Sequence, residues 1–348
     1  MPGPGDSTPP RAGRRDPDGE LWRKRGKAWG PVRRFGPFLG ETALRRAARP
    51  RDFLLISLLG IFWGSSFLFV ELSLTGVPPV TMVAGRVVVA ALVLGLALRL
   101  RGGSLPRGLG LWRDFAVIAV LGNIAPFFFI GWGQLGVDSG LAAILMATVP
   151  LATGLLAHLL TPDEKLNAWK VAGIALGFAG IVALIGPDAL AGLGREVAAQ
   201  ISILAGALCY ALTTIYARRL QRVDPVAASA GVMIAASVMA VPLSLWLDSA
   251  AELAPSTTAI LAVVVLGVFP TALASILLFR IVATIGATFV SLTNYLVPLV
   301  GVVCGIVFLD ESFGLSLLLA FLLILGGIAL AQRRPRSRPA SDQSLRPG

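Results

Sequence analysis

The 348-residue chain has little charge, two cysteines and one histidine, and each of these scarcities argues against a class of protein. Charged residues make up 14% of the sequence, whereas a soluble domain carries about 25%. The single histidine, His158, has no cluster of cysteines or carboxylates around it, so the sequence predicts no metal site. Cys209 and Cys304 lie in apolar stretches, and we interpret them as small core residues rather than a disulfide or redox pair.

Catalytic and cofactor motifs are missing as well. The chain has no phosphate-cradling loop of the Walker type and no buried nucleophile with a base beside it. The sequence therefore predicts that the protein is not an enzyme and needs no cofactor.

What the chain has in abundance is apolar sequence. Hydrophobic residues reach 55% and the mean hydropathy is +0.79. A bilayer core needs roughly 20 apolar residues of helix to be crossed, and only helices or closed barrels satisfy their backbone there. We therefore predict an all-α polytopic membrane protein with ten transmembrane helices, at about 53–75, 78–100, 114–136, 139–161, 168–187, 197–217, 226–247, 258–282, 285–308 and 314–332.

The basic residues support this topology. The net charge is +11, and residues 1–51 alone hold thirteen Lys or Arg against five Asp or Glu. If the N-terminus is cytoplasmic, the exterior loops carry one basic residue, Arg195, and the interior loops carry ten, as the positive-inside rule requires. Those ten are Arg99, Arg101, Arg107, Arg113, Lys165, Lys170, Arg218, Arg219, Arg222 and Arg280. We predict a multi-pass membrane protein with both termini cytoplasmic. The basic ends then have membrane lipids rather than nucleic acid as partners.

The chain also repeats itself. Residues 139–184 and 287–330 both run from a small residue through a proline, Pro150 or Pro298, to an Asp-Glu pair and a glycine-rich helix. Five helices per half is an odd number, so the two halves insert with opposite orientations, a recurrent plan of secondary carriers. We divide the chain into a basic, mostly disordered tail (1–52), two five-helix repeats (53–187 and 188–332) and a basic C-terminal tail (333–348).

Short motifs in both halves resemble a known family. FWGSSFLFVEL (62–72), the Arg86 region and PLATGLLAHLLTPDE (150–164) resemble the first EamA domain of the drug/metabolite transporter superfamily, and PLVGVVCGIVFLDES (298–312) resembles the second. The resemblance covers about residues 53–332. It implies a ten-helix carrier of a bacterial inner membrane, with a central cavity between the repeats, which moves amino acids, metabolites or drugs, often outward.

Two charged residues within the apolar stretches are candidates for gating or coupling. Arg86 lies two turns into the second helix, and Glu71 ends the first helix on the same exterior side. A buried arginine in a membrane is costly unless it pairs, so we expect Arg86 to pair with Glu71, with a substrate contact of Arg86 as the competing interpretation. Proton coupling through Glu71 or His158 is a further hypothesis.

Polar and aromatic residues near mid-membrane are the candidates for substrate binding. For each serine or threonine the competing interpretation is backbone-bonded packing, and for each asparagine it is interhelical hydrogen bonding. Trp63 and Tyr210 rank higher because the repeat makes them equivalent, as it does Asn123 and Thr271. The full candidate set is Trp63, Ser66, Arg86, Asn123, Tyr210, Thr213, Thr271, Asn294 and Tyr295.

We therefore interpret the protein as a secondary carrier that moves a small organic solute across the membrane by alternating access, with efflux as the expected direction. The alternative is a membrane-embedded receptor or scaffold without solute flux.

Overall fold

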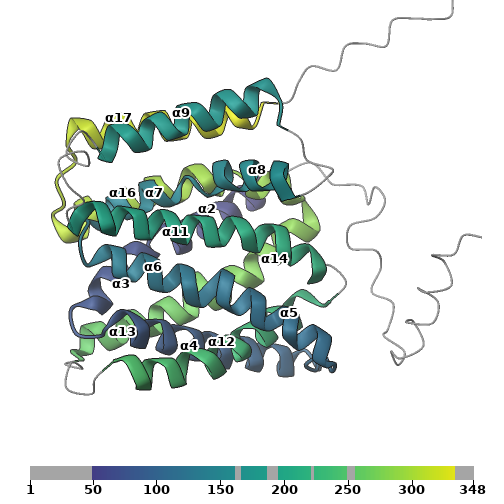
Figure 1. The fold of residues 1–348 in the computed structure, drawn as a ribbon. Helices are drawn as coiled ribbons and strands as arrows, with labels where there is room; N and C mark the ends of the chain where they lie inside the picture. The colour runs from purple at the N-terminus through teal and green to yellow at the C-terminus, as the bar shows by residue number, and fades with distance from the viewer. Residues whose placement is uncertain (1–48, 161–165, 186–194, 221–222, 249–254, 334–348) are drawn as a thin grey trace, which may run out of the picture. The chain divides into compact units, whose positions relative to one another are not determined.

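Helices are the only regular elements in the part of the chain that the computed structural model describes, residues 49–160, 166–185, 195–220, 223–248 and 255–333 (Figure 1). All of them belong to one of two compact units, residues 42–348, and that unit alone is described below. The predicted tails lie almost wholly outside the described residues, and so does the Asp163-Glu164 pair.

Seven helical segments of the described chain are long and apolar enough to cross a membrane. Most are built from shorter helices joined end to end. In chain order they comprise α2 (Pro50–Gly64) with α3 (Ser66–Leu74), α4 (Pro79–Leu100), α5 (Leu109–Ala119) with η2 (Val120–Ile124) and α6 (Ala125–Gln134), α7 (Ser139–Met146) with α8 (Val149–Leu160), α11 (Arg195–Tyr216) with η3 (Ala217–Leu220), α12 (Pro225–Leu247), and α13 (Thr257–Leu266) with η5 (Gly267–Leu273) and α14 (Ala274–Thr284).

Three further apolar helices are shorter: α9 (Ala168–Ile185), α16 (Thr293–Leu309), which follows the single turn α15 (Ala287–Val290), and α17 (Leu315–Ala331). The all-helical fold is thus confirmed for the described residues, with seven helices of membrane length. The count of ten spans stays a prediction.

Local sequence signals set several helix starts. Proline occupies the first position of α2, α4 and α12, where its missing N–H has no intrahelical partner to lose. The carboxylate of Asp224 caps α12 by accepting the Ala227 N–H at 2.8 Å, and the Ser256 hydroxyl accepts the Ala259 N–H at 3.1 Å at the start of α13. These helix ends are therefore encoded within a few residues of the ends themselves.

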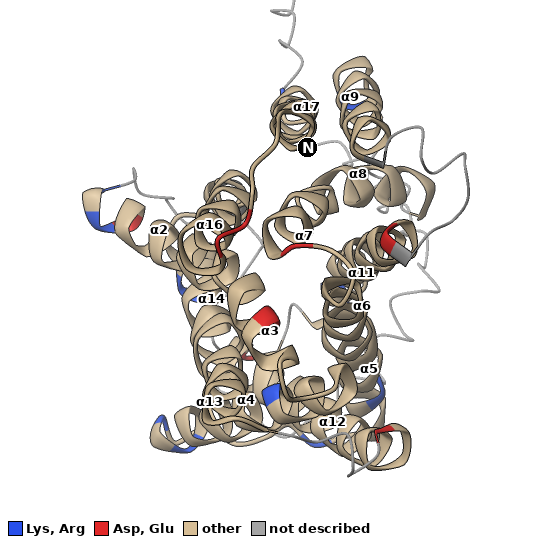
Figure 2. Ribbon diagram, turned by 90° about the vertical axis from the view of Figure 1, so that its left-hand side faces the viewer, with Lys and Arg blue, Asp and Glu red and all other residues tan. Residues whose placement is uncertain are grey.

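Equivalent helices of the two sequence repeats pack against each other. Helix α9 lies along α17, α4 along α12 and α7 along α16, while α3 packs on α13 as α6 packs on α11 (Figures 1 and 2). The α9–α17 contact depends on Gly173 and Gly327, because a Cβ on Gly327 would lie only 2.6 Å from the Gly173 carbonyl oxygen. Small residues let these two backbones approach closely.

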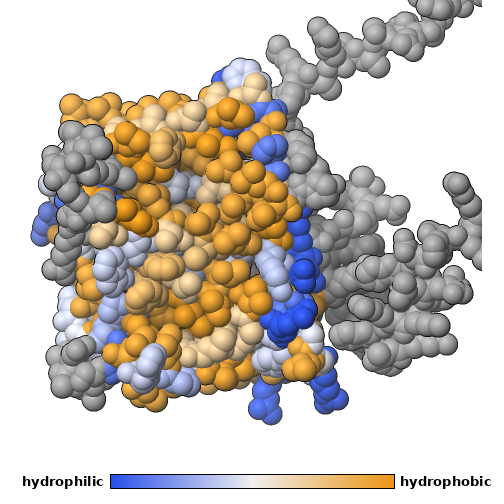
Figure 3. Space-filling view, viewed as in Figure 1, coloured by the Kyte–Doolittle hydropathy of each residue, from blue (hydrophilic) through white to orange (hydrophobic). Residues whose placement is uncertain are grey.

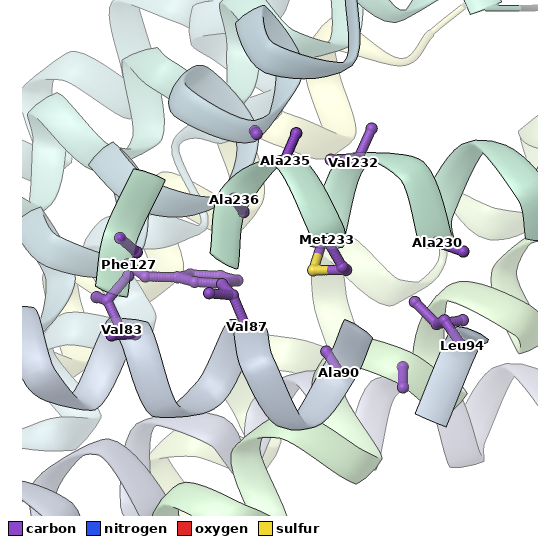
Figure 4. Packing of buried hydrophobic residues seen from close by; sticks show 14 of the residues in the cluster. Val83, Val87, Ala90, Leu94, Phe127, Ala230, Val232, Met233, Ala235 and Ala236 are labelled. Carbon is purple, nitrogen blue, oxygen red and sulfur yellow. The ribbon is translucent and has the colours of Figure 1, made fainter. Parts of the chain in front are cut away.

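The largest buried cluster joins α4 and α12 (Figure 4). Val87, Ala90 and Leu94 of α4 are fully buried. Val87 and Ala90 lie opposite Met233 of α12 and Leu94 lies near Ala230, while the Phe127 ring of α6 joins the same cluster. Alanines along α12 shorten the distance between the helices, and this packing fixes the rotation of α4 about its axis. That rotation decides which way the polar residues of α4 face.

The outside of the bundle is strongly apolar. Large side chains such as Val238, Leu245 and Phe308 are 69%, 80% and 67% exposed. On the face seen in Figure 3, apolar residues cover the middle, and hydrophilic residues gather along the right-hand end. An exposed apolar surface of this extent is that of a protein embedded in lipid.

Candidate functional site

Two membrane-length helices are interrupted at the middle by a turn of π-helix, η2 in the first repeat and η5 in the second. Each turn carries a buried polar residue: Asn123 in η2 is 8% exposed and Thr271 in η5 is 4% exposed. Each side chain donates a hydrogen bond to a carbonyl five residues earlier, Asn123 to Ile118 at 3.4 Å and Thr271 to Leu266 at 2.7 Å. Single π turns inside α-helices are frequent at functional sites. The repeat-derived equivalence of Asn123 and Thr271 thus has a structural counterpart.

Proline accounts for the Thr271 bond. Pro270 has no N–H to offer to the Leu266 carbonyl, which a residue four positions later would ordinarily bond. The Thr271 hydroxyl takes over this role, since it donates to that carbonyl. Because the hydroxyl proton is used in this bond, the Thr271 oxygen can only accept a hydrogen bond from its other neighbour.

That neighbour is Arg86 of α4. The Nε of Arg86 donates to the Thr271 hydroxyl oxygen at 2.8 Å, and the guanidinium carbon lies 3.5 Å from the centre of the Phe127 ring. Phe127 in turn makes an edge contact with Tyr210 of α11, with ring centres 6.5 Å apart. Arg86 is 6% exposed. The cluster of Arg86, Phe127, Tyr210 and Thr271 therefore draws on helices of both sequence repeats.

The expected pairing of Arg86 with Glu71 is wrong. The Glu71 carboxylate accepts a hydrogen bond from Gln134 Nε2 at 3.2 Å, and the same amide donates to the Phe67 carbonyl oxygen at 2.9 Å. Arg86 has the Thr271 hydroxyl as its hydrogen-bond partner, and no ion pair joins it to Glu71. The α4–α12 packing turns Arg86 towards η5, whereas Glu71 faces the end of α6.

Among the described residues, Arg86 has no carboxylate partner, and its side chain contacts the Thr271 hydroxyl and the Phe127 ring. Only Nε of its guanidinium has an acceptor there. A buried guanidinium with free donors can hold an oxyanion.

Carboxylates of the second repeat cap helices of the first at one end of the bundle. Glu311 accepts the N–H groups of Ser139 and Gly140 at 2.8 and 2.9 Å, at the start of α7. Asp248, at the end of α12, accepts both the N–H and the hydroxyl of Thr81 at 2.7 Å, in the first turn of α4. Figure 2 shows acidic residues on α3, before α7 and after α16 at this end.

The Asp310-Glu311 pair precedes α17 in the chain but does not cap it. Helix α17 starts at Leu315 after the N-cap residue Gly314, without a side-chain cap, and Glu311 caps α7 instead. Asp310 has a left-handed φ of 54°, which ends α16 and turns the chain so that Glu311 reaches α7. Burial and the nearby Glu311 raise the pKa of Asp138, which precedes α7 but makes no cap bond of its own.

The other candidates lie apart from the Arg86 cluster or turn to their own helices. Ser66 donates to the Trp63 carbonyl at 2.6 Å and Thr213 to the Cys209 carbonyl at 2.9 Å, as packing hydroxyls do. The Tyr295 hydroxyl lies 3.2 Å from the Gln332 side chain. Trp63 packs in a cluster with Ile56 and Ala274, and Asn294 is half-buried. A binding role for these residues stays a prediction.

Sequence reasoning missed Phe127 and Gln134 as members of a polar site. Phe127 stands in an aromatic run that looks like ordinary packing, and a glutamine at a helix end resembles a solvated residue. Neither had a signal that local sequence could supply. Within the described chain no group of His, Cys, Asp or Glu is arranged to hold a metal ion.

Comparison with known proteins identifies the two repeats. The profile of the EamA-like transporter family matches residues 52–186 and 197–332. The uncharacterized transporter YvbV of Bacillus subtilis (strain 168) is 27% identical over 309 residues, covering 86% of this chain and 97% of that protein. The uncharacterized inner membrane transporter YedA of Escherichia coli (strain K12) is 28% identical, covering 71% and 79%.

Two further comparisons concern the transported solute and the fold. A probable terminal-alkyne amino-acid exporter of Streptantibioticus cattleyicolor is 26% identical over 293 residues, covering 82% of this chain and 95% of that protein. One solved crystal structure aligns with a TM-score of 0.60 at 24% identity, covering 82% of this chain and 97% of that chain, a likeness of fold alone.

Proposed function

The chain belongs to the EamA-like transporter family, and we propose that it is a secondary carrier that moves a small organic solute across a membrane by alternating access. The observation that carries this proposal is the Arg86 cluster. It is buried, polar and built from both repeats, with π-helical turns beside it. A substrate held there would be released to one side or the other as the repeats rearrange.

We further propose ten spans in two inverted five-helix repeats, 53–187 and 188–332, with both termini in the cytoplasm. The contacts between equivalent helices support this plan, because a two-fold axis in the membrane plane would bring α4 onto α12 and α9 onto α17. If each repeat can adopt two similar packings and the two repeats exchange them, the symmetry yields an inward-open and an outward-open state.

The caps by Glu311 and Asp248 are the contacts we assign to closure of the exterior end. Each ties a loop after a helix of the second repeat to a helix start of the first. For this end to open, these hydrogen bonds must break. Water must then hydrate the freed groups, or a proton must neutralise the carboxylate.

Glu71 is the group we propose for proton coupling. Its neighbour Gln134 has a buried side-chain oxygen, Oε1, that finds no donor among the described residues. Once the Gln134 amide turns over, a protonated Glu71 can donate to that oxygen, so the pair can accommodate the carboxyl group in both protonation states. If Glu71→Gln leaves transport and its pH dependence unchanged, proton coupling through Glu71 is excluded.

Outward movement of an amino-acid-like solute is the transport mode we propose, since one relative bears the name of an amino-acid exporter. The test is counterflow of radiolabelled amino acids and monocarboxylates in proteoliposomes that contain the purified protein. A carrier accumulates label against unlabelled solute, whereas a receptor or scaffold shows no flux above empty liposomes.

A cross-link adds a matched control for alternating access. A Cβ on Gly140 of α7 would lie 3.5 Å from the Cα of Val302 on α16, which is within reach of a disulfide between the repeats. The same Cβ would lie 2.9 Å from the Glu311 carboxylate, whose flexible side chain must shift, so flux in the reduced double variant is the reference. With Cys209 and Cys304 replaced by serine, oxidation of a Gly140→Cys, Val302→Cys variant should stop flux, and reduction should restore it. Each single-cysteine variant should be insensitive to oxidant.

A further inference from the structure

The free donors of Arg86 define the chemistry of the solute. Resting on the carrier function proposed above, we propose that the substrate carries a single carboxylate, which the Arg86 guanidinium binds through its two terminal nitrogens.

The first argument is the cost of the buried charge. Arg86 is 6% exposed and lies in a helix of membrane length. Removing a guanidinium from water costs several kcal/mol, which is ordinarily offset by a carboxylate partner. Among the described residues no such partner reaches it, and the Phe127 ring and one hydroxyl supply only part of the compensation. An anionic ligand would supply the rest.

The second argument is orientation. Thr271 accepts from Nε, and its own proton is held by the Leu266 carbonyl, so this contact fixes the guanidinium from one edge. The Phe127 ring covers one face of the guanidinium plane at 3.5 Å. What remains is the end-on pair of terminal nitrogens, Nη1 and Nη2, whose parallel N–H groups match the two oxygens of a carboxylate.

The third argument is the number of charges. Among the described residues no carboxylate contacts Arg86: Glu71 is bonded to Gln134, and Glu311 is bonded to the start of α7. A single fixed positive charge balances one negative charge, so the site favours a monoanion over a phosphomonoester or a dicarboxylate. The rings of Phe127 and Tyr210 favour an apolar or aromatic body beside the carboxylate.

The experiment compares benzoate with its neutral isostere benzamide. Thermal unfolding of the purified full-length protein is followed in detergent with either compound, at matched ionic strength, and counterflow of radiolabelled benzoate is measured in proteoliposomes. We expect benzoate to bind at least roughly tenfold more tightly than benzamide, since bidentate charge-assisted bonds exceed neutral ones in strength. In Arg86→Gln this preference should disappear, and in Arg86→Lys it should weaken but persist, because lysine keeps the charge without the fork.

Three outcomes separate the claims. Equal binding of benzoate and benzamide, or a benzoate preference that survives in Arg86→Gln, overturns the carboxylate site. Arg86-dependent binding of benzoate without flux of any solute overturns the carrier function and leaves the site intact. If Arg86→Gln fails to fold, Thr271→Val serves as the test, because it keeps the Arg86 charge and removes the acceptor at Nε. The preference for benzoate over benzamide should then fall several-fold. An unchanged preference overturns the proposal.

Discussion

Removal of the Glu311 carboxylate should loosen the end of the bundle that we propose to be exterior, without affecting the Arg86 cluster. Glu311 accepts two backbone N–H groups at the start of α7, from Ser139 at 2.8 Å and Gly140 at 2.9 Å. In Glu311→Ala these donors lose their acceptor, and Asp138 makes no cap bond to the first turn of α7. The substitution therefore destabilises the state in which α7 and the α16–α17 loop are in contact.

The free energy lost in Glu311→Ala can be worked out from the two hydrogen bonds. A hydrogen bond to a charged group contributes about 1.5–3 kcal/mol, and loss of a helix N-cap costs about 0.5–2 kcal/mol. The carboxylates of Asp138 and Glu71 repel Glu311 and reduce the net value. We therefore expect a loss of about 2 kcal/mol, which corresponds to about a 30-fold shift towards the open exterior end. Glu311→Gln keeps one acceptor and should lose about half as much free energy.

Two assays report on this loss. Thermal unfolding in detergent measures stability, and maleimide labelling of Cys304 measures opening, because this residue of α16 is 9% exposed and adjoins Gly305, which approaches Glu311 closely. Labelling is done in a Cys209→Ser background. Glu311→Ala should lower the unfolding midpoint and speed labelling.

Two variants serve as matched controls. Asp310→Asn removes the neighbouring, exposed carboxylate, and asparagine tolerates the left-handed backbone, so neither readout should change. Asp224→Ala removes a cap within the second repeat and should lower stability without faster labelling of Cys304. If Glu311→Ala behaves like Asp310→Asn in both assays, the reasoning about this cap is refuted.

Three further changes test packing, positioning and charge. Gly327→Ala should destabilise the α9–α17 contact by about 1–3 kcal/mol, since its Cβ would meet the Gly173 carbonyl at 2.6 Å; Gly326→Ala, whose Cβ would lie 3.5 Å from the nearest side chain, should unfold at the wild-type temperature or slightly above. Thr271→Val should weaken solute binding several-fold, because the guanidinium loses the contact that orients it, with Thr271→Ser near wild type; equal binding by both variants would contradict the positioning role. Asp138→Asn should raise stability at neutral pH: the folded protein holds the Asp138 proton more tightly than the unfolded chain, so stability falls as pH rises from the ordinary pKa of 3.8 to the raised one. This gain should shrink as the pH approaches 3.8, and a gain independent of pH in unfolding scans would show that another cause is at work.

The helical fold and its membrane lengths could be predicted because their signals are local. Long apolar runs bounded by proline and basic residues mark the spans, and the self-similarity of residues 139–184 and 287–330 marks the repeat. The equivalence of Asn123 and Thr271 came from the same alignment, and the two residues occupy matching π-helical turns. Such features depend on a residue and its near neighbours along the chain.

The partners of the charged residues could not be predicted in this way. Glu71 and Arg86 look like a pair because their helices are joined by a short turn, yet the rotation of each helix sends the two side chains to different neighbours. Likewise, a glutamate beside a helix start looks like its cap, and Glu311 caps another helix.

Apolar length, repetition and the asymmetry of basic charge were thus fixed by the sequence alone, because each is a property of consecutive residues. Only the tertiary structure decided which donor meets which acceptor. Arg86 and Thr271 are 185 residues apart in the chain, and Ser139 and Glu311 are 172 apart. Contacts over such separations depend on helix rotation and depth in the packed bundle, and many side chains set these together.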